Sequence, residues 1–156
     1  MLQTSPDTGN CLELTTIAMD VHASCIGSSV RRLDRIVSKA YDLALRSLNL
    51  TGTQFTLLCY IARKHGIASV EIGNAANIDK STLSRNLKRL LKSGYITMDP
   101  PCGPRRRGLF LTMKGEESIR RAHPSWEKVN QKLRATLGLN NTCNLAVILE
   151  AVEKTS

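Results

Sequence analysis

Apolar residues recur at intervals of three or four along most of this chain, which is the spacing of one face of an α-helix. One such stripe runs from Ile26 to Leu48, with charged side chains on the opposite face. A second runs from Ile119 to Leu137, where Pro124 should kink or break the helix, and a third from Leu145 to Val152. The pattern predicts a mainly α-helical protein with about six helices.

Three shorter helices are predicted between these long ones, at about 53–66, 69–77 and 80–92. Asp79 can accept backbone hydrogen bonds as the N-cap of the last of them. Asn77 readily adopts a left-handed turn conformation, so the last two helices should be joined by a very short turn. Two short helices joined in this way form a helix-turn-helix.

A hairpin is predicted directly after the helix-turn-helix. Tyr95–Met98 and Leu109–Leu111 have the alternation of short strands. The intervening residues 99–108 contain three prolines and two glycines, which exclude a helix, and they end in the arginines Arg105, Arg106 and Arg107. The hairpin is therefore the small β-wing of a winged helix-turn-helix.

These elements predict a flexible N-terminal arm over residues 1–20 and a single domain over residues 21–156. Its dimerisation helices are expected at about 21–49 and 113–153, and its winged helix-turn-helix at about 53–112. The N- and C-terminal helices carry more apolar surface than the small middle module can cover, so a second copy of the chain should cover the rest. A two-fold dimer would place its two recognition helices about 34 Å apart, one turn of DNA.

The charge of the chain is concentrated in the same region. With 156 residues, 42% of them apolar and 22% charged, the composition is that of a soluble protein with one core. The formal net charge is +9, and the segment from Lys80 to Arg121 alone contributes +8. Such a local field favours an acidic partner, above all nucleic acid, although anionic lipid or an acidic protein would also suit it.

Other classes of protein are disfavoured by the sequence. The five cysteines are odd in number and have no CxxC spacing, which argues against a disulfide framework and a zinc site. We find no signal peptide and no apolar run of the roughly 20 residues that a membrane span needs. We therefore expect a cytoplasmic protein that neither spans a membrane nor has a membrane as its partner. No catalytic constellation and no metal or cofactor site is recognisable, which argues against an enzyme.

The helix predicted at 80–92 carries the candidate DNA contacts. Arg85 is placed to bind a guanine edge bidentately, and Lys80 and Lys88 to neutralise phosphates. The hydroxyls of Ser81, Thr82 and Ser84 can contact bases or phosphates. The alternative is that these side chains form the solvated face of an ordinary helix.

The wing carries three consecutive arginines. They favour phosphate or minor-groove contact over a purely solubilising role, since their mutual repulsion is relieved by an anion.

The residues of several elements resemble the MarR family of bacterial winged-helix repressors. The matching segments are Tyr41-Asp42 with Leu45, Leu50-Thr51, Gln54-Phe55, Asp79 through Leu87, Leu90 through Gly94, Leu111-Thr112 with Gly115, and Pro124 with Trp126. The likeness covers about residues 25–138. One departure is in the wing, where Gly103 stands at the position at which the family usually has an aspartate that braces the arginine, here Arg105.

The resemblance also implies two kinds of signal. The family's small aromatic or phenolic ligands typically bind where the first, second and fifth helices meet the winged module, and Arg32, Phe55 and Trp126 would line that place here. Its peroxide-sensing branch keeps a reactive cysteine near Cys25, although the matching position is Gly27. The alternative for Cys25 is a small buried apolar residue.

The sequence therefore predicts a homodimer that binds a palindromic operator in double-stranded DNA and regulates transcription, as a repressor released by a small ligand. A thiol-based redox regulator of the same fold is the first alternative. The second is a sequence-blind nucleoid protein or an RNA-binding protein.

Overall fold

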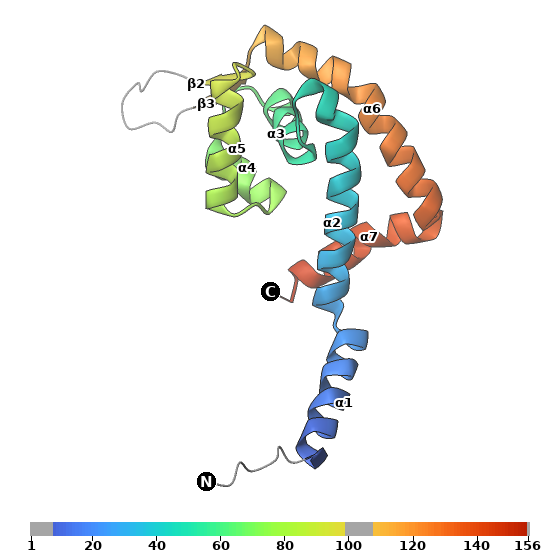
Figure 1. Cartoon of the computed structure of the whole chain (residues 1–156). Helices are drawn as coiled ribbons and strands as arrows, with labels where there is room; N and C mark the ends of the chain where they lie inside the picture. Colours follow the sequence, from blue (N-terminus) through green and yellow to red (C-terminus); the bar gives the residue numbers. More distant parts are fainter. Residues whose placement is uncertain (1–7, 99–107, 156) are drawn as a thin grey trace. The chain divides into compact units, whose positions relative to one another are not determined.

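The computed structural model describes residues 8–98 and 108–155 of the chain. It forms two compact units, Met1–Val37 and Ser38–Ser156, and the boundary between them falls within helix α2. The described elements are α1 (Thr8–Ser24), α2 (Ile26–Leu45), the 3-10 helix η1 (Arg46–Leu48), α3 (Gly52–Arg63), β1 (Ile67–Ala68), α4 (Ser69–Ala76), α5 (Lys80–Lys92), β2 (Ile96–Met98), β3 (Gly108–Leu111), α6 (Met113–Leu137) and α7 (Leu139–Glu153) (Figure 1). The mainly helical class with a small β-wing is confirmed.

Helix α1 in the first unit was not predicted. Residues 8–20 are helical in the segment for which we expected a flexible arm, and Cys25 separates α1 from α2. The large apolar side chains of α1, all more than half exposed, fall on two opposite sides of the helix, with Leu12 and Met19 on one and Leu14, Ile17 and Val21 on the other. Because they form no single stripe, the pattern of period 3.6 that identified the other helices is missing here.

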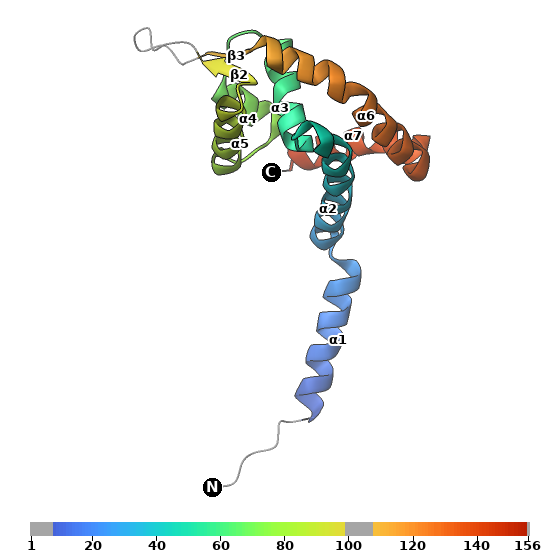
Figure 2. The same cartoon turned by 45° about the horizontal axis from the view of Figure 1, so that its top comes forward.

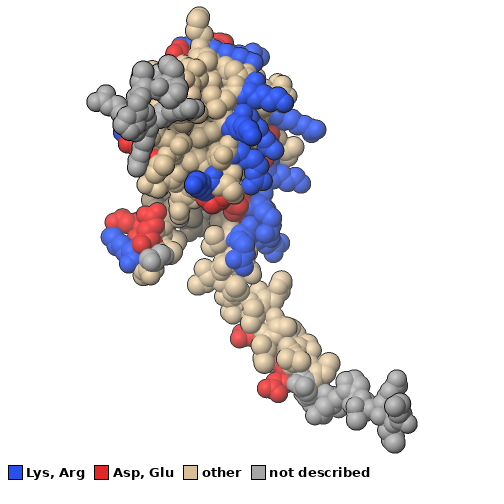
Figure 3. Space-filling view, turned by 90° about the vertical axis from the view of Figure 1, so that its left-hand side faces the viewer, with Lys and Arg blue, Asp and Glu red and all other residues tan. Residues whose placement is uncertain are grey.

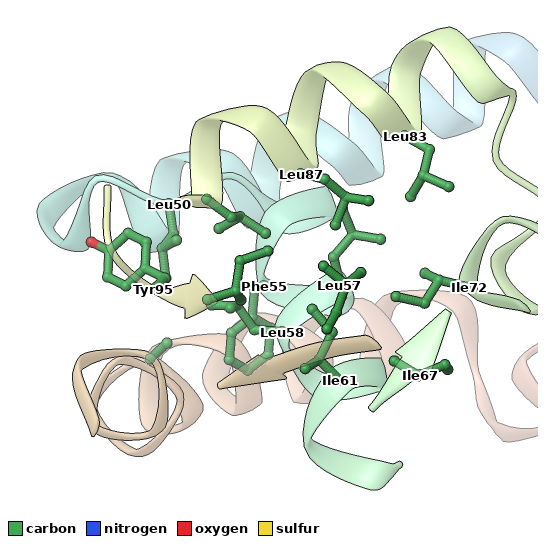
Figure 4. Close-up of a cluster of buried hydrophobic side chains, with 14 of the residues drawn as sticks. Leu50, Phe55, Leu57, Leu58, Ile61, Ile67, Ile72, Leu83, Leu87 and Tyr95 are labelled. Carbon is green, nitrogen blue, oxygen red and sulfur yellow. The ribbon is translucent and has the colours of Figure 1, made fainter. Parts of the chain in front are cut away.

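Helix α3 supplies several side chains to the core of the second unit. Figure 4 shows the side chains of α3 converging with those of α4, α5 and the strands. Leu57, Leu58 and Ile61 of α3 are completely buried. The core holds α5 against the rest of the unit through the apolar side of that helix, so the opposite side of α5 is left at the surface.

Three short antiparallel strands form a sheet in the order β1-β3-β2. Ile96 lies opposite Leu111, and Ile67 opposite Leu109. The hairpin of β2 and β3 confirms the predicted wing strands, whereas β1 was not predicted. With only two residues, β1 carries no alternation, and it depends on pairing with residues some 40 positions later in the chain.

Polar side chains start the helices of this unit. The Thr51 hydroxyl accepts the Gln54 N–H at 3.2 Å, and the Gln54 side chain accepts the Thr51 N–H at 3.1 Å, which is a capping box. The Thr112 hydroxyl accepts the Gly115 N–H at 3.1 Å at the start of α6. These contacts explain why α3 and α6 begin where they do.

Helices α6 and α7 end the described chain. Helix α6 continues through Pro124, so the alternative of a break at that residue is wrong. A proline removes only its own bond to the carbonyl of Arg120, and the helix accommodates this by curving, as Figures 1 and 2 show. None of the described helices is long and apolar enough to span a membrane.

Candidate nucleic-acid interface

A very short turn joins α4 to α5. Asn77 has a φ of 47°, in the left-handed region, and its N–H donates to the Asn74 carbonyl at 3.3 Å. The Ile78 N–H donates to the Gly73 carbonyl at 3.0 Å. A side chain at Gly73 would come within 3.2 Å of Leu83, so the glycine permits the close approach of α4 and α5. The predicted helix-turn-helix is confirmed.

Asp79 fixes the first turn of α5. One oxygen of its carboxylate, Oδ1, accepts the N–H groups of Ser81 at 3.0 Å and Thr82 at 2.9 Å. The Ser81 hydroxyl donates to the same oxygen at 2.6 Å. These hydrogen bonds hold the pKa of Asp79 well below its usual range. The predicted N-cap is confirmed, and it orients the start of the helix.

The two sides of α5 differ sharply. Leu83, Leu87 and Leu90 are buried in the core, whereas the other side is polar and exposed. The exposed residues are Lys80, Ser81, Ser84, Arg85, Lys88, Arg89 and Lys92. Thr82 is half-buried on the flank of the helix. The structure therefore brings five of the six predicted contact residues of α5 to one exposed surface.

The exposed side of α5 is basic and unneutralised. None of the ion pairs found among the described residues involves a cation of α5. Figure 3 shows the Lys and Arg side chains gathered into a band on this face of the molecule. Such a surface is suited to an extended anion.

Two asparagine side chains beside α5 were not predicted as site residues from the sequence. A groove of about 930 Å³ runs between α4 and α5, and Asn74 and Asn77 line it opposite Lys80, Ser84 and Lys88. Both asparagines are exposed. Their two short polar side chains, three positions apart before a basic helix, were the signal that could have identified them.

The far end of α5 is attached to the wing and to α6. The Tyr95 hydroxyl donates to the Leu48 carbonyl at 3.2 Å. The Lys114 ammonium lies 4.9 Å from the centre of the Tyr95 ring and donates to the Ser93 carbonyl at 2.8 Å. At Gly115 any side chain would collide with the Tyr95 carbonyl oxygen, so glycine is required there. These contacts hold the segment between α5 and the wing against α6.

The wing itself is described only at its base, where Met98 lies opposite Leu109. Arg105, Arg106 and Arg107 lie outside the described residues. On either side of them, Met98 ends β2 and Gly108 begins β3, and β2 itself follows α5 after only three residues.

The residues predicted to line a ligand site are only partly brought together. The rings of Phe55 and Trp126 lie 6.2 Å apart, and Trp126 also stacks on Tyr41 at 6.3 Å. Phe55 is buried in the core, whereas Trp126 is half-buried and lines a cleft of about 420 Å³. Arg32 is exposed and belongs to the other unit, Met1–Val37.

Cys25 lies between α1 and α2 and is half-buried. Hydrogen bonds from the Ser28 side chain and backbone lower the pKa of its thiol, and the charge of Arg31 adds to this effect. Cys59, by contrast, packs against the core, and burial raises the pKa of its thiol. The two cysteines therefore differ in their tendency to form a thiolate.

No group of three or more His, Cys, Asp or Glu side chains in the part of the chain that the structure describes could hold a metal ion.

The chain is similar to known transcriptional regulators. A model described as MarR family matches residues 48–107. The multiple antibiotic resistance protein MarR of Salmonella typhimurium is 32% identical to this chain, over 79% of this chain and 87% of that protein.

Solved structures show the same fold over most of the chain. The Mycobacterium tuberculosis transcriptional regulator MosR is 30% identical, with a TM-score of 0.75, over 84% of this chain and 97% of MosR. A structure of MosR in complex with DNA matches with a TM-score of 0.73 and 28% identity, over 85% of this chain and 98% of that one.

Proposed function

Because this chain belongs to the MarR family of transcriptional regulators, we propose that it acts as a homodimer on a palindromic operator in double-stranded DNA. It represses transcription while bound and is released by a small ligand. The observation that carries this proposal is the exposed basic side of α5, held by the Asp79 cap at one end and by Tyr95 at the other.

In this proposal α5 enters the major groove. Arg85 donates two hydrogen bonds to a guanine edge, a contact that its planar guanidinium can make in one plane. Ser81, Thr82 and Ser84 contact bases or phosphates, with Thr82 contributing least because it is half-buried. Lys80 and Lys88 neutralise phosphates on either side of the groove.

The wing arginines contact the adjacent phosphates or the minor groove. The base of the wing lies directly after α5, so a loop from residues 99–107 would lie beside the groove that α5 occupies. Because Gly103 replaces the bracing aspartate, Arg105, Arg106 and Arg107 contribute affinity more than sequence preference.

Dimerisation is proposed from the apolar surface that the single chain leaves exposed. On α7 the side chains of Val147, Ile148, Leu149 and Val152 are each more than half exposed. A second copy would bury them, and it would also present two recognition helices to successive major grooves. The structure of MosR in complex with DNA supports the binding of DNA by a protein of this fold.

Release follows if a signal favours a dimer whose two α5 helices no longer match the groove repeat. A small ligand that binds one dimer conformation more tightly shifts the population toward it. The cleft beside Trp126 is the proposed site of such a ligand.

The test is the selection of bound duplexes from a random DNA pool with the wild-type protein. We expect a palindromic consensus whose half-sites are centred about 10 base pairs apart, and a gel-shift preference for it over random duplex and over RNA at physiological salt. A pool that yields no consensus, or RNA that competes as well as the selected duplex, would show the sequence-blind alternative instead.

A redox regulator of the same fold is a second candidate, and the lowered pKa of Cys25 favours it. A thiolate reacts with peroxide more readily than a thiol, and oxidation at the junction of α1 and α2 would alter both helices. Peroxide should then abolish DNA binding by the wild type but not by Cys25→Ser, while Cys143→Ser, at a cysteine that is exposed, should behave as the wild type. Loss of binding in all three proteins would exclude Cys25 as the sensor.

A further inference from the structure

The cleft of about 420 Å³ is formed within the unit Ser38–Ser156 by the end of α2, by α3, by α6 and by the turn before α5. Its volume is in the range of small-molecule sites, which begin at about 300 Å³. The residues that line the cleft indicate which kind of molecule it would hold.

The charge of this cleft is opposite to that of the chain. The chain has a formal net charge of +9, yet the residues that line the cleft include no Lys and no Arg, and one carboxylate, Asp42. Asp42 accepts the Gly52 N–H at 2.7 Å, which fixes its side chain at the edge of the cleft. The charge of Arg134 opposes the rise that burial causes in the pKa of Tyr41, but Arg134 is not part of the lining. An anionic ligand would therefore meet a carboxylate here and no cation.

The remaining walls are aromatic. The rings of Tyr41 and Trp126 are stacked, with centres 6.3 Å apart and planes inclined by 19°. Tyr60 lines the cleft from α3, and its hydroxyl donates to the Ala75 carbonyl at 3.0 Å, which holds the ring in place. All three rings are half-buried. Aromatic faces carry negative partial charge and attract cations within about 6 Å of the ring centre.

We propose that this cleft binds a planar aromatic cation, with its ring against Tyr41, Tyr60 and Trp126 and its positive charge facing Asp42. The inference rests on the proposed function for its consequence, because this ligand would be the signal that releases DNA. Ala76 and Ile78 also line the cleft, and they flank the turn that leads into the Asp79 cap of α5. A ligand here thus contacts the segment that orients the recognition helix.

The chain contains one tryptophan, so the fluorescence of Trp126 reports on the cleft directly. The probes are 1-methylquinolinium and 1-naphthoate, which are bicyclic, similar in size and opposite in charge. We expect the cation to change the Trp126 emission and to bind at least about tenfold more tightly than the anion, the size of effect that one well-placed charge produces. Equal affinity, or tighter binding of 1-naphthoate, would overturn the proposal.

Asp42→Asn tests the carboxylate. The asparagine oxygen can still accept the Gly52 N–H, so the fold is retained while the charge is removed. We expect about a tenfold loss of affinity for 1-methylquinolinium. Asp20→Asn removes the same charge from α1, outside the cleft, and should leave that affinity unchanged. Equal affinities of the two variants would contradict the role of Asp42.

Tyr60 provides a matched test of the aromatic wall. Tyr60→Phe and Tyr60→Leu both lose the hydrogen bond to the Ala75 carbonyl, but only the phenylalanine keeps the ring face. The cation should bind Tyr60→Phe several-fold more tightly than Tyr60→Leu. Equal binding by both variants would show that the ring face does not contribute.

The proposed function and this inference fail separately. If the protein selects no duplex but binds 1-methylquinolinium through Asp42, the proposed DNA binding is wrong and the ligand site stands. If it binds a selected operator and 1-methylquinolinium neither changes the Trp126 emission nor releases the DNA, the ligand class is wrong and the DNA-binding proposal stands.

Discussion

Helices α5 and α7 both carry several large apolar residues, but these residues lie in opposite environments. On α5 the exposed fractions of Leu83, Leu87 and Leu90 are 6%, 6% and 1%. On α7 those of Ile148 and Leu149 are 56% and 62%. Helix α5 is therefore fully supported by its own unit, which leaves its polar side available for a ligand, whereas the single chain leaves the apolar residues of α7 exposed.

The energetic scale of this difference is large. Burying one Leu or Ile side chain contributes about 1.5–3 kcal/mol. The exposed apolar residues of α7 therefore leave several times this amount unrealised in a single chain, which is the physical basis for expecting a dimer. The same substitution should accordingly have different consequences on the two helices.

The largest expected effect is on α5. Leu87→Ala should lower the free energy of unfolding by about 3 kcal/mol, since it leaves a cavity in the core. Urea denaturation measures this, and the loss should not depend on protein concentration. Lys88→Ala, one residue away on the exposed side, should change stability by less than about 0.5 kcal/mol. Similar losses in both variants would contradict the two-sided account of α5.

The next effect is on α7. Leu149→Glu places a charge in the apolar surface and should weaken self-association by about 100-fold, since a buried unpaired charge is costly. Sedimentation velocity at several protein concentrations measures this. Asn144→Glu adds the same charge at a polar position of the same helix and should weaken association far less. If the wild type sediments as a single subunit at all concentrations, α7 is not the dimer surface.

A smaller effect is expected where α5 joins the rest of its unit. Tyr95→Phe removes the hydrogen bond from the Tyr95 hydroxyl to the Leu48 carbonyl but keeps the ring under Lys114. We expect a loss of about 1 kcal/mol in unfolding free energy. No measurable loss would mean that this contact does not hold the C-terminal end of α5.

The smallest effect is the pH dependence of the α5 cap. Hydrogen bonds from Ser81 and Thr82 hold the pKa of Asp79 below its unfolded value of about 3.9. The stabilisation by the carboxylate is therefore complete above this value and is lost as the pH falls through the lower pKa of the folded protein. Asp79→Ser keeps a capping oxygen that does not titrate.

Thermal unfolding from pH 7 to pH 2 measures that difference. The advantage of the wild type over Asp79→Ser should be constant between pH 5 and pH 7 and should shrink below about pH 4. An advantage that stays constant to pH 2 would show that the Asp79 carboxylate is not preferentially stabilised in the folded protein.

The elements that sequence could predict are those whose signals are local. Asp79, Asn77 and the leucine spacing of α5 lie within a few residues of one another, and the structure confirms the cap, the turn and the buried side. The exposure of Arg85 and Lys88 follows from the same spacing. For these residues, local chemistry and the tertiary fold agree.

The elements that sequence missed depend on distant or absent partners. Strand β1 exists because Ile67 pairs with Leu109, a contact that no pattern of two residues can reveal. The apolar residues of α1 occupy two sides of the helix and so give no single stripe. The aromatic cleft was only partly predicted, because Asp42 and Tyr60 join Trp126 through the packing of α2, α3 and α6.

The central claim is that α5 reads base sequence and that its lysines bind phosphate. The most direct test measures the affinity of Arg85→Ala and Lys88→Ala for a selected operator and for random duplex over a range of salt concentrations. Arg85→Ala should lose about 10- to 100-fold on the operator and little on random DNA. Lys88→Ala should lose similarly on both, with a salt slope lowered by about one. Equal losses on both duplexes for Arg85→Ala would contradict the account.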